Sequence, residues 1–94
     1  MKELQLTYTA IGELRPCIGM AALKKHGKHE LMRSLFQLLQ SYTSLTSRQA
    51  RPFRFAINNF IEMEAARHCS IHLSDRELSA IWPPEVEWSS FIKL

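Results

Sequence analysis

Residues 28–42, KHELMRSLFQLLQSY, form the segment that decides the fold. Leucines recur in this segment at the three- and four-residue spacing of one helix face, and Met32 and Phe36 widen that face. The residues on the predicted stripe are Leu31, Leu35, Leu38, Leu39 and Tyr42. The pattern predicts an amphipathic helix over 28–42 that supplies much of the core.

The segment after this helix contains a second helix start. Thr46 and Gln49 have the T-x-x-Q spacing of a capping box, which places a helix start there. Pro52 follows six residues later and disfavours the α conformation at Arg51. Either the helix kinks at Pro52 or its long part begins there. We expect this part to run to about His68, with an inward face formed by Phe53, Ile57, Phe60 and Ile61.

The strongest local signal lies further along, in residues 73–78, LSDREL. Ser74 and Glu77 have the spacing of a capping box, and Leu73 with Leu78 has that of a hydrophobic staple. This predicts a short helix over 75–82, which Pro83-Pro84 ends. We expect the tail that follows either to close the core or to dock on a partner; its apolar residues are Trp88, Phe91 and Ile92.

The first 27 residues are harder to interpret. Alternation from Leu4 to Ala10 favours a strand, whereas Leu4, Tyr8 and Ile11 also fit a helical stripe. We favour a helix, because a lone strand would have no partner for its backbone groups. Arg15-Pro16 is interpreted as a turn that starts a second short helix, which runs to Gly27.

The 94 residues, 46% of them apolar, fit one hydrophobic core. The sequence therefore predicts an all-α protein, a single compact bundle of four to five short helices over residues 1–94. A stretch of about 20 apolar residues, as a bilayer span requires, is absent, and the start lacks the pattern of a signal peptide. Two cysteines do not suggest a disulfide framework. We expect a cytoplasmic protein without membrane contact, and membership in an oligomer or complex is open.

The charges are unevenly distributed along the chain. Residues 1–54 contain nine Lys and Arg against three acidic residues, whereas residues 55–94 contain three against six. Such polarity suits a chain that presents a basic face to a polyanion and an acidic flank to a protein. The alternative is that these charges only solvate exposed helix faces.

The basic residues of the first part form two groups. One surrounds the turn before the 28–42 helix, and the other recurs every third residue near the next helix start. The candidates for nucleic-acid binding are Lys24, Lys25, Lys28 and Arg33 in the first group and Arg48, Arg51 and Arg54 in the second. Either group is able to neutralise two or three phosphates without reading bases, and whether the groups merge depends on packing.

Catalytic and metal sites have weaker support. His26-x-x-His29 and Cys69-x-x-His72 together make a possible zinc-ligand set, although it lacks paired cysteines. The alternative is that Cys69 is a small buried apolar residue and that the histidines are solvated or lie near phosphates. No turn or glycine-lined oxyanion site accompanies either cysteine. We therefore expect no enzyme activity, no cofactor and no metal.

The segment SLTSRQARPFRFAINNFIEM, residues 44–63, resembles a helix of the small subunits of multi-subunit CRISPR interference (Cascade-like) complexes. The resemblance covers about a fifth of the chain. It implies a non-catalytic subunit for antiviral defence, present in several copies side by side, that contacts the crRNA-guided complex subunits and steadies the target or displaced nucleic-acid strand. Arg48 and Arg51 are the residues that the resemblance carries over, and Arg54 is added on charge alone.

A second function remains open. The chain could be a helical protein-interaction adaptor or inhibitor with no nucleic-acid contact. Its exposed aromatic residues, which we expect to anchor it on a partner, are then Trp82, Trp88 and Phe91.

Overall fold

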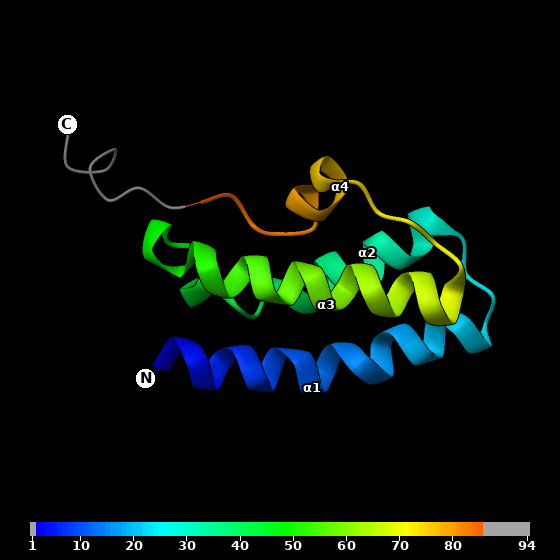
Figure 1. The fold of residues 1–94 in the computed structure, drawn as a ribbon, viewed down its shortest axis with the longest axis horizontal. Helices are drawn as coiled ribbons and strands as arrows, with labels where there is room; N and C mark the ends of the chain where they lie inside the picture. Colours follow the sequence, from blue (N-terminus) through cyan, green and yellow to red (C-terminus); the bar gives the residue numbers. More distant parts are fainter. Residues whose placement is uncertain (1, 86–94) are drawn as a thin grey trace.

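The computed structural model describes residues 2–85 and consists of helices and connecting segments (Figure 1). Within that range the elements are α1 (Lys2–Leu23), α2 (Lys28–Leu39), η1 (Thr43–Thr46), η2 (Arg48–Ala50), α3 (Arg51–Cys69) and α4 (Asp75–Ala80), where η1 and η2 are short 3₁₀ helices. The described part contains no strand. The prediction of an all-α helical bundle is therefore confirmed, and the ambiguous first segment is helical.

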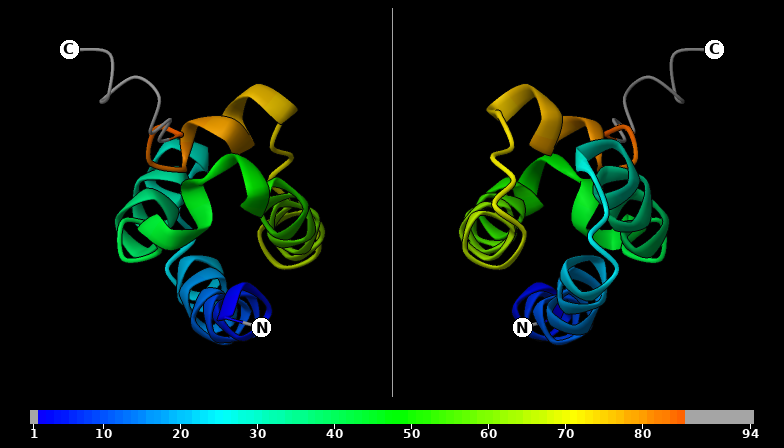
Figure 2. Two further views of the ribbon diagram at one scale, coloured as in Figure 1. Left: turned by 90° about the vertical axis from the view of Figure 1, so that its left-hand side faces the viewer. Right: turned by 90° about the vertical axis from the view of Figure 1, so that its right-hand side faces the viewer.

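α1 and α3 run in the same direction along the bundle, and α2 runs in the opposite direction between them in sequence (Figure 1). α1 packs mainly along α3 and also contacts α2. Viewed end on, these helices form a triangle, and α4 crosses on the side of α2 and α3 that faces away from α1 (Figure 2). The buried core residues come from all four α-helices and from the residue after α4, among them Leu14, Leu35, Ile57, Leu78 and Ile81.

α1 is one continuous helix of 22 residues, so the predicted turn at Arg15-Pro16 is wrong. Pro16 lies inside the helix, where it removes one backbone hydrogen bond and crowds the preceding turn. Leu14 and Ile18, on either side of it, are both buried in the same core. Packing of this continuous apolar face against α3 outweighs the local penalty, and Pro16 itself faces solvent.

The expected capping box of Thr46 and Gln49 does not form. Thr46 is buried, and its hydroxyl donates a hydrogen bond of 2.6 Å to the carbonyl oxygen of Thr43 inside η1. The chain then passes through η2, and the long helix begins at Arg51 with Pro52 in its first turn. The sequence left open whether the helix kinks at Pro52 or begins there, and in the structure it begins there. Proline is well tolerated in the first turn because its missing N–H would have no partner within the helix.

The capping box before α4 is confirmed. The backbone N–H of Glu77 donates to the Ser74 hydroxyl at 3.2 Å, and the N–H of Ser74 donates to the Glu77 carboxylate at 2.8 Å. Leu73 and Leu78 are both buried in the core, as expected for the staple. α4 ends at Ala80, two residues earlier than predicted.

Trp82 is not the exposed anchor that the adaptor hypothesis required. It is buried, and its indole N–H donates a hydrogen bond of 2.7 Å to the side-chain oxygen of Asn58 on α3. The other two predicted anchors, Trp88 and Phe91, lie outside the described residues. Across residues 2–85, no helix has the length and apolar content needed to cross a bilayer.

Candidate nucleic-acid interface

The two predicted basic groups lie at opposite ends of the molecule. The turn between α1 and α2 is at one end of the bundle and the start of α3 is at the other (Figure 1). The molecule measures 47 Å along its longest axis. The two groups therefore do not merge into one continuous stripe, and each end has to be considered by itself.

At the first end, Lys24 and Lys25 form the exposed turn that ends α1. The N–H of Lys25 donates to the carbonyl of Ala22 at 3.2 Å, and the N–H of His26 donates to that of Ala21 at 2.9 Å. This is the hydrogen-bond pattern of a Schellman cap, whose central position is usually glycine. Here that position is Lys25, with a φ of 54°. A residue with a Cβ in this left-handed conformation costs about 1–2 kcal/mol.

Neither ammonium group of this turn has a partner within residues 2–85. Lys24 and Lys25 make no side-chain hydrogen bond or ion pair with that part of the chain. Both cations follow directly after the last turn of α1, where a positive charge also interacts favourably with the helix dipole. They are nevertheless available to an external anion.

Lys28 belongs to the same end but already has an acidic partner. Its ammonium lies 3.1 Å from the carboxylate of Glu77, which connects α2 to α4. The backbone N–H of Ser74 and the Lys28 ammonium lower the pKa of Glu77. An anion that bound Lys28 would therefore have to compete with an ionised carboxylate.

Arg33 lies on the second turn of α2, away from the turn itself. It lines an open hollow of about 420 Å³ between α2 and the end of α4, together with His29, Phe36 and Ile81. Its guanidinium has no ion-pair or hydrogen-bond partner among the described residues. Arg33 is therefore a third cation available to solvent on this half of the molecule.

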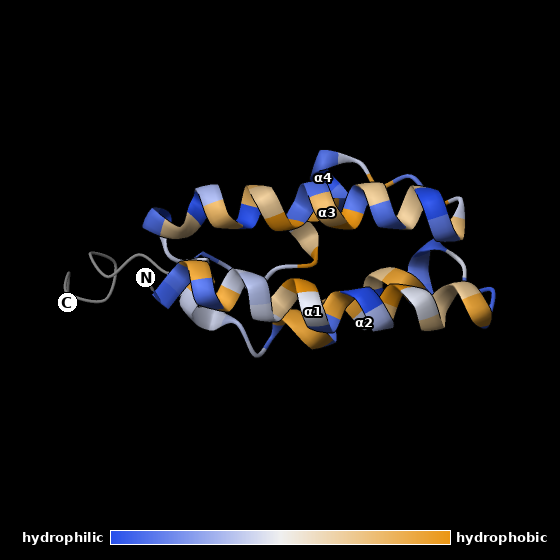
Figure 3. Ribbon diagram, turned by 60° about the horizontal axis from the view of Figure 1, so that its bottom comes forward, coloured by the Kyte–Doolittle hydropathy of each residue, from blue (hydrophilic) through white to orange (hydrophobic). Residues whose placement is uncertain are grey.

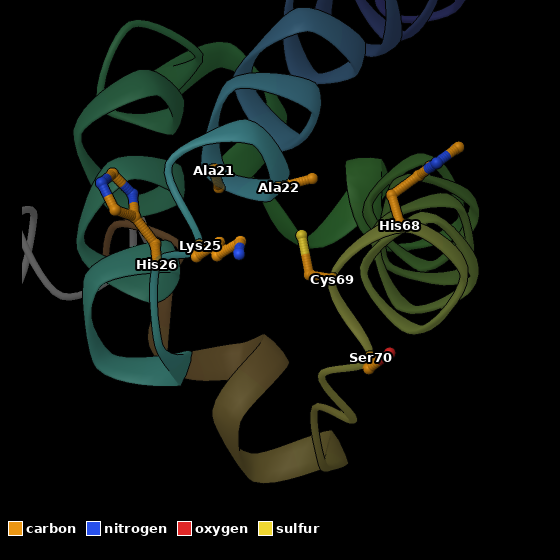
Figure 4. Close-up of a pocket in the computed structure, with 7 residues that line it drawn as sticks. All are labelled: Ala21, Ala22, Lys25, His26, His68, Cys69 and Ser70. Atoms are coloured by element: carbon orange, nitrogen blue, oxygen red, sulfur yellow. The ribbon is translucent and has the colours of Figure 1, made fainter.

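A pocket of about 260 Å³ lies beside the α1–α2 turn (Figure 4). It is bounded by the last turn of α1, by the turn itself and by the end of α3. Its lining residues are Ala21, Ala22, Lys25, His26, His68, Cys69 and Ser70. Lys25 extends from the turn toward the side of the pocket formed by Cys69, the Cys69 thiol points toward α1, and the rings of His26 and His68 point away from the pocket (Figure 4). The sequence does not predict that the end of α3 lines this pocket, because that arrangement depends on α1 and α3 running in the same direction.

At the opposite end, Arg54 is part of the internal structure. Its guanidinium donates to the carbonyl oxygens of Leu45 and Ser47, at 2.5 and 2.7 Å, and to the Glu85 carboxylate at 2.6 Å. Only 14% of the Arg54 side chain is exposed. These bonds use the donors that a phosphate would need, so we do not include Arg54 in a binding surface.

The other two arginines of this end differ from each other. Arg51 forms a two-bond ion pair with the same Glu85 carboxylate, at 2.8 and 2.9 Å. Hydrogen bonds and positive charge from Arg51, which contributes most, and from Arg54 lower the pKa of the Glu85 carboxyl group. Arg48, in contrast, is exposed and its side chain has no ion-pair or hydrogen-bond partner within the described range. Of the seven predicted binding residues, Lys24, Lys25, Arg33 and Arg48 thus have no charge partner among residues 2–85.

The four possible zinc ligands do not form a site. Within residues 2–85, no group of three or more His, Cys, Asp or Glu side chains is placed to hold a metal ion. Burial raises the pKa of the Cys69 thiol, which donates weakly to the carbonyl oxygen of Ile18. This matches the alternative interpretation of Cys69 as a partly buried, neutral thiol.

Comparison with known protein families, with characterised proteins and with solved structures gives no match for this chain.

Proposed function

We propose that this chain is a non-catalytic helical subunit that binds the phosphate backbone of nucleic acid without base preference. The observation that carries the proposal is the α1–α2 turn, where Lys24 and Lys25 expose two adjacent ammonium groups that have no partner in the part of the chain that the structure describes. Arg33 adds a third available cation along α2. The pairing of Lys28 with Glu77 narrows the binding surface at this end of the bundle to these three residues.

The mechanism is electrostatic positioning. Each lysine or arginine that neutralises a phosphate releases a condensed counterion, so affinity falls as salt rises. Three contacts correspond to a slope of about −2 to −3 in a plot of log affinity against log salt concentration. Because ammonium and guanidinium groups contact phosphate oxygens and no base edge, all sequences should bind about equally.

The similarity of residues 44–63 to CRISPR small subunits supplies the assembly in which we place this activity. In this proposal, copies of the chain lie side by side in a crRNA-guided ribonucleoprotein complex, with Arg48 toward the target or displaced strand. The exposure of Arg48 and the absence of a partner for it among the described residues support this orientation. Arg51 takes part only where a phosphate displaces Glu85.

Charge removal at the turn tests the backbone-binding proposal. The variant Lys24→Ala/Lys25→Ala should bind a mixed-sequence 20-nucleotide single strand about 10-fold more weakly in low salt, with a salt slope smaller by about 1–2. The control Lys2→Ala/Arg76→Ala removes the same formal charge from two other exposed sites. Fluorescence anisotropy measures both. Equal losses in the two variants, or no loss in the first, would contradict binding at the turn.

A specific feature also favours the second candidate function, a protein-interaction adaptor. The solvent-facing side of α1 carries exposed apolar side chains, with Tyr8 69% and Leu23 80% exposed. α1 has no polar side chain from Cys17 to Leu23, as the hydropathy colouring shows (Figure 3). A partner that covers this face would bury apolar surface now in contact with water.

Substitution on this face tests the adaptor candidate without touching the basic turn. Tyr8→Lys and Met20→Lys place charges on exposed positions and should leave folding unchanged within about 0.5 kcal/mol. Copurification from cells should lose the protein partner in these variants and keep it in Lys24→Ala/Lys25→Ala. Retention of the same partner in all variants would exclude α1 as the contact surface.

A further inference from the structure

Two residues with unfavourable backbone conformations lie at the same pocket. Lys25 and Ser70 are the two non-glycine residues with positive φ within residues 2–85, at 54° and 55°. Each follows the end of a helix, α1 and α3, at a position where glycine is the usual residue. Both line the pocket between these helix ends. Residues held in sparsely populated conformations concentrate at binding sites, which directs attention to this pocket.

The backbone cap at the end of α1 does not require a lysine side chain at position 25. Glycine would make the same backbone cap without strain, because the hydrogen bonds involve only main-chain atoms. Lysine adds an ammonium group on a side chain that points across the pocket toward Cys69 (Figure 4). That ammonium has no ion pair within the described residues. The left-handed turn therefore directs an unpaired cation over a hollow.

The chemistry of the pocket walls suits an anion. None of its seven lining residues is acidic. The thiol of Cys69 points toward α1, donates to the carbonyl oxygen of Ile18 and is neutral, since burial raises its pKa. Glu64 lies 3.6 Å from the imidazole of His68, whose ring points away from the pocket (Figure 4). The volume of about 260 Å³ is below that of pockets for drug-sized ligands and suits a small group.

We propose that this pocket is a phosphate subsite, in which Lys25 holds one phosphate group of a nucleic acid. The inference rests on the proposed function and deepens it, because it selects Lys25 over Lys24 as the principal contact. Lys24 is equally charged and adjacent, but it does not line the pocket. A phosphate seated between Lys25 and the end of α3 would also be shielded from solvent more than one on the open surface.

The substitution Lys25→Gly separates this role from a structural one. Glycine relieves the left-handed strain, so the thermal unfolding midpoint should not fall and should rise by up to a few degrees. Binding of the 20-nucleotide strand should nevertheless weaken about 3- to 10-fold, with the salt slope smaller by about 1. Lys24→Ala is the matched control and should weaken binding less than Lys25→Gly. A variant that is more stable and binds less tightly is the expected signature.

The alkylation rate of Cys69, which lines the pocket, reports directly on whether the pocket is occupied. In a Cys17→Ser background, the rate at which iodoacetamide alkylates Cys69 should fall when the oligonucleotide is added, and Lys25→Gly should abolish this protection. Inorganic phosphate replaces the oligonucleotide in a parallel experiment. Protection by phosphate alone indicates a site for the free ion, and protection only by the oligonucleotide indicates a site for a backbone phosphate; both support the pocket.

The outcomes separate the two proposals. If Lys24→Ala weakens binding and Lys25→Gly does not, the subsite is wrong and backbone binding at the turn stands. If, instead, Lys24→Ala/Lys25→Ala binds like the wild type, the proposed function itself fails. Unchanged alkylation of Cys69 in the presence of both ligands would likewise overturn the subsite.

Discussion

Arg54 and Glu85 are joined by an ion pair of 2.6 Å that links α3 to the segment after α4, 31 residues later in the chain. The same guanidinium donates to the carbonyl oxygens of Leu45 and Ser47 in the connection before α3. A single side chain therefore connects three segments at one end of the bundle. This arrangement makes Arg54 a determinant of stability.

The substitution Arg54→Ala should lower the free energy of unfolding by about 2–3 kcal/mol, since two carbonyl oxygens lose their donor and the ion pair is broken. Urea denaturation measures this change. Arg48→Ala removes the same charge from an exposed side chain nearby and should change stability by less than about 0.5 kcal/mol. Equal effects of the two substitutions would show that the internal bonds of Arg54 contribute nothing.

Glu85 should make stability sensitive to acid. Hydrogen bonds and charge from Arg51 and Arg54 depress the pKa of its carboxyl group in the folded state. A depressed folded-state pKa gives stabilisation that is present above the unfolded value of about 4.3 and is lost as pH falls through the folded value. The unfolding midpoint of the wild type should therefore fall below pH 4 more steeply than that of Glu85→Gln. Parallel pH profiles for the two proteins would refute the assignment.

Tyr42 should make stability sensitive to alkali. Burial raises its pKa to about 12, and the carboxylate of Glu13, which accepts a hydrogen bond from the phenol, adds to the shift. A raised folded-state pKa gives stabilisation that is complete below the unfolded value of about 10 and disappears as pH rises toward 12. Thermal unfolding should show this loss between pH 10 and 12, and Tyr42→Phe should not show it. The phenolate absorbance that appears near pH 12 should also be missing from the variant.

The glycines of α1 should be replaceable with a gain in stability. A Cβ added at Gly12 or Gly19 would meet no atom within 4 Å, and neither glycine has a positive φ. Each Gly→Ala change should therefore stabilise the helix by about 0.5–1 kcal/mol. Chemical denaturation of the single and double variants tests this. A loss of stability on either substitution would reveal an intramolecular contact at that position.

The helices that the sequence predicted correctly have strong local signals. α2 combines a clear apolar period with a start after Gly27, and α4 has both halves of a capping box. These signals involve residues at most a few positions apart. Such interactions form the same way in most tertiary contexts, so pattern alone was sufficient for them.

The errors arose where distant segments decide the outcome. Proline at position 16 is a helix breaker by local criteria, but burial of Leu14 and Ile18 against the rest of the core keeps α1 continuous. Trp82 looked like an exposed anchor because its hydrogen-bond partner, Asn58, lies 24 residues away. Neither contact can be read from spacing along the chain.

The candidate site was predictable only in part, for the same reason. Arg48 and Arg54 belong to the same three-residue repeat, yet within residues 2–85 Arg48 has no partner whereas Arg54 is held by Glu85. Lys24 and Lys25 are likewise adjacent and identical in type, and they differ in backbone conformation and in that Lys25 alone of the two lines the pocket. The charge pattern is sufficient to locate the basic turn. The role of each residue in the turn also depends on how α3 packs against α1, which the sequence pattern does not show.

Pro16 gives α1 an asymmetry between its two sides. The proline cannot donate the hydrogen bond that the carbonyl of Gly12 would receive in an uninterrupted helix. Both residues lie on the solvent side, while Leu14 anchors the inner side in the core. The backbone of α1 therefore lacks one hydrogen bond on its solvent-facing side. The helix is able to bend there to fit a neighbouring molecule while Leu14 stays packed in the core.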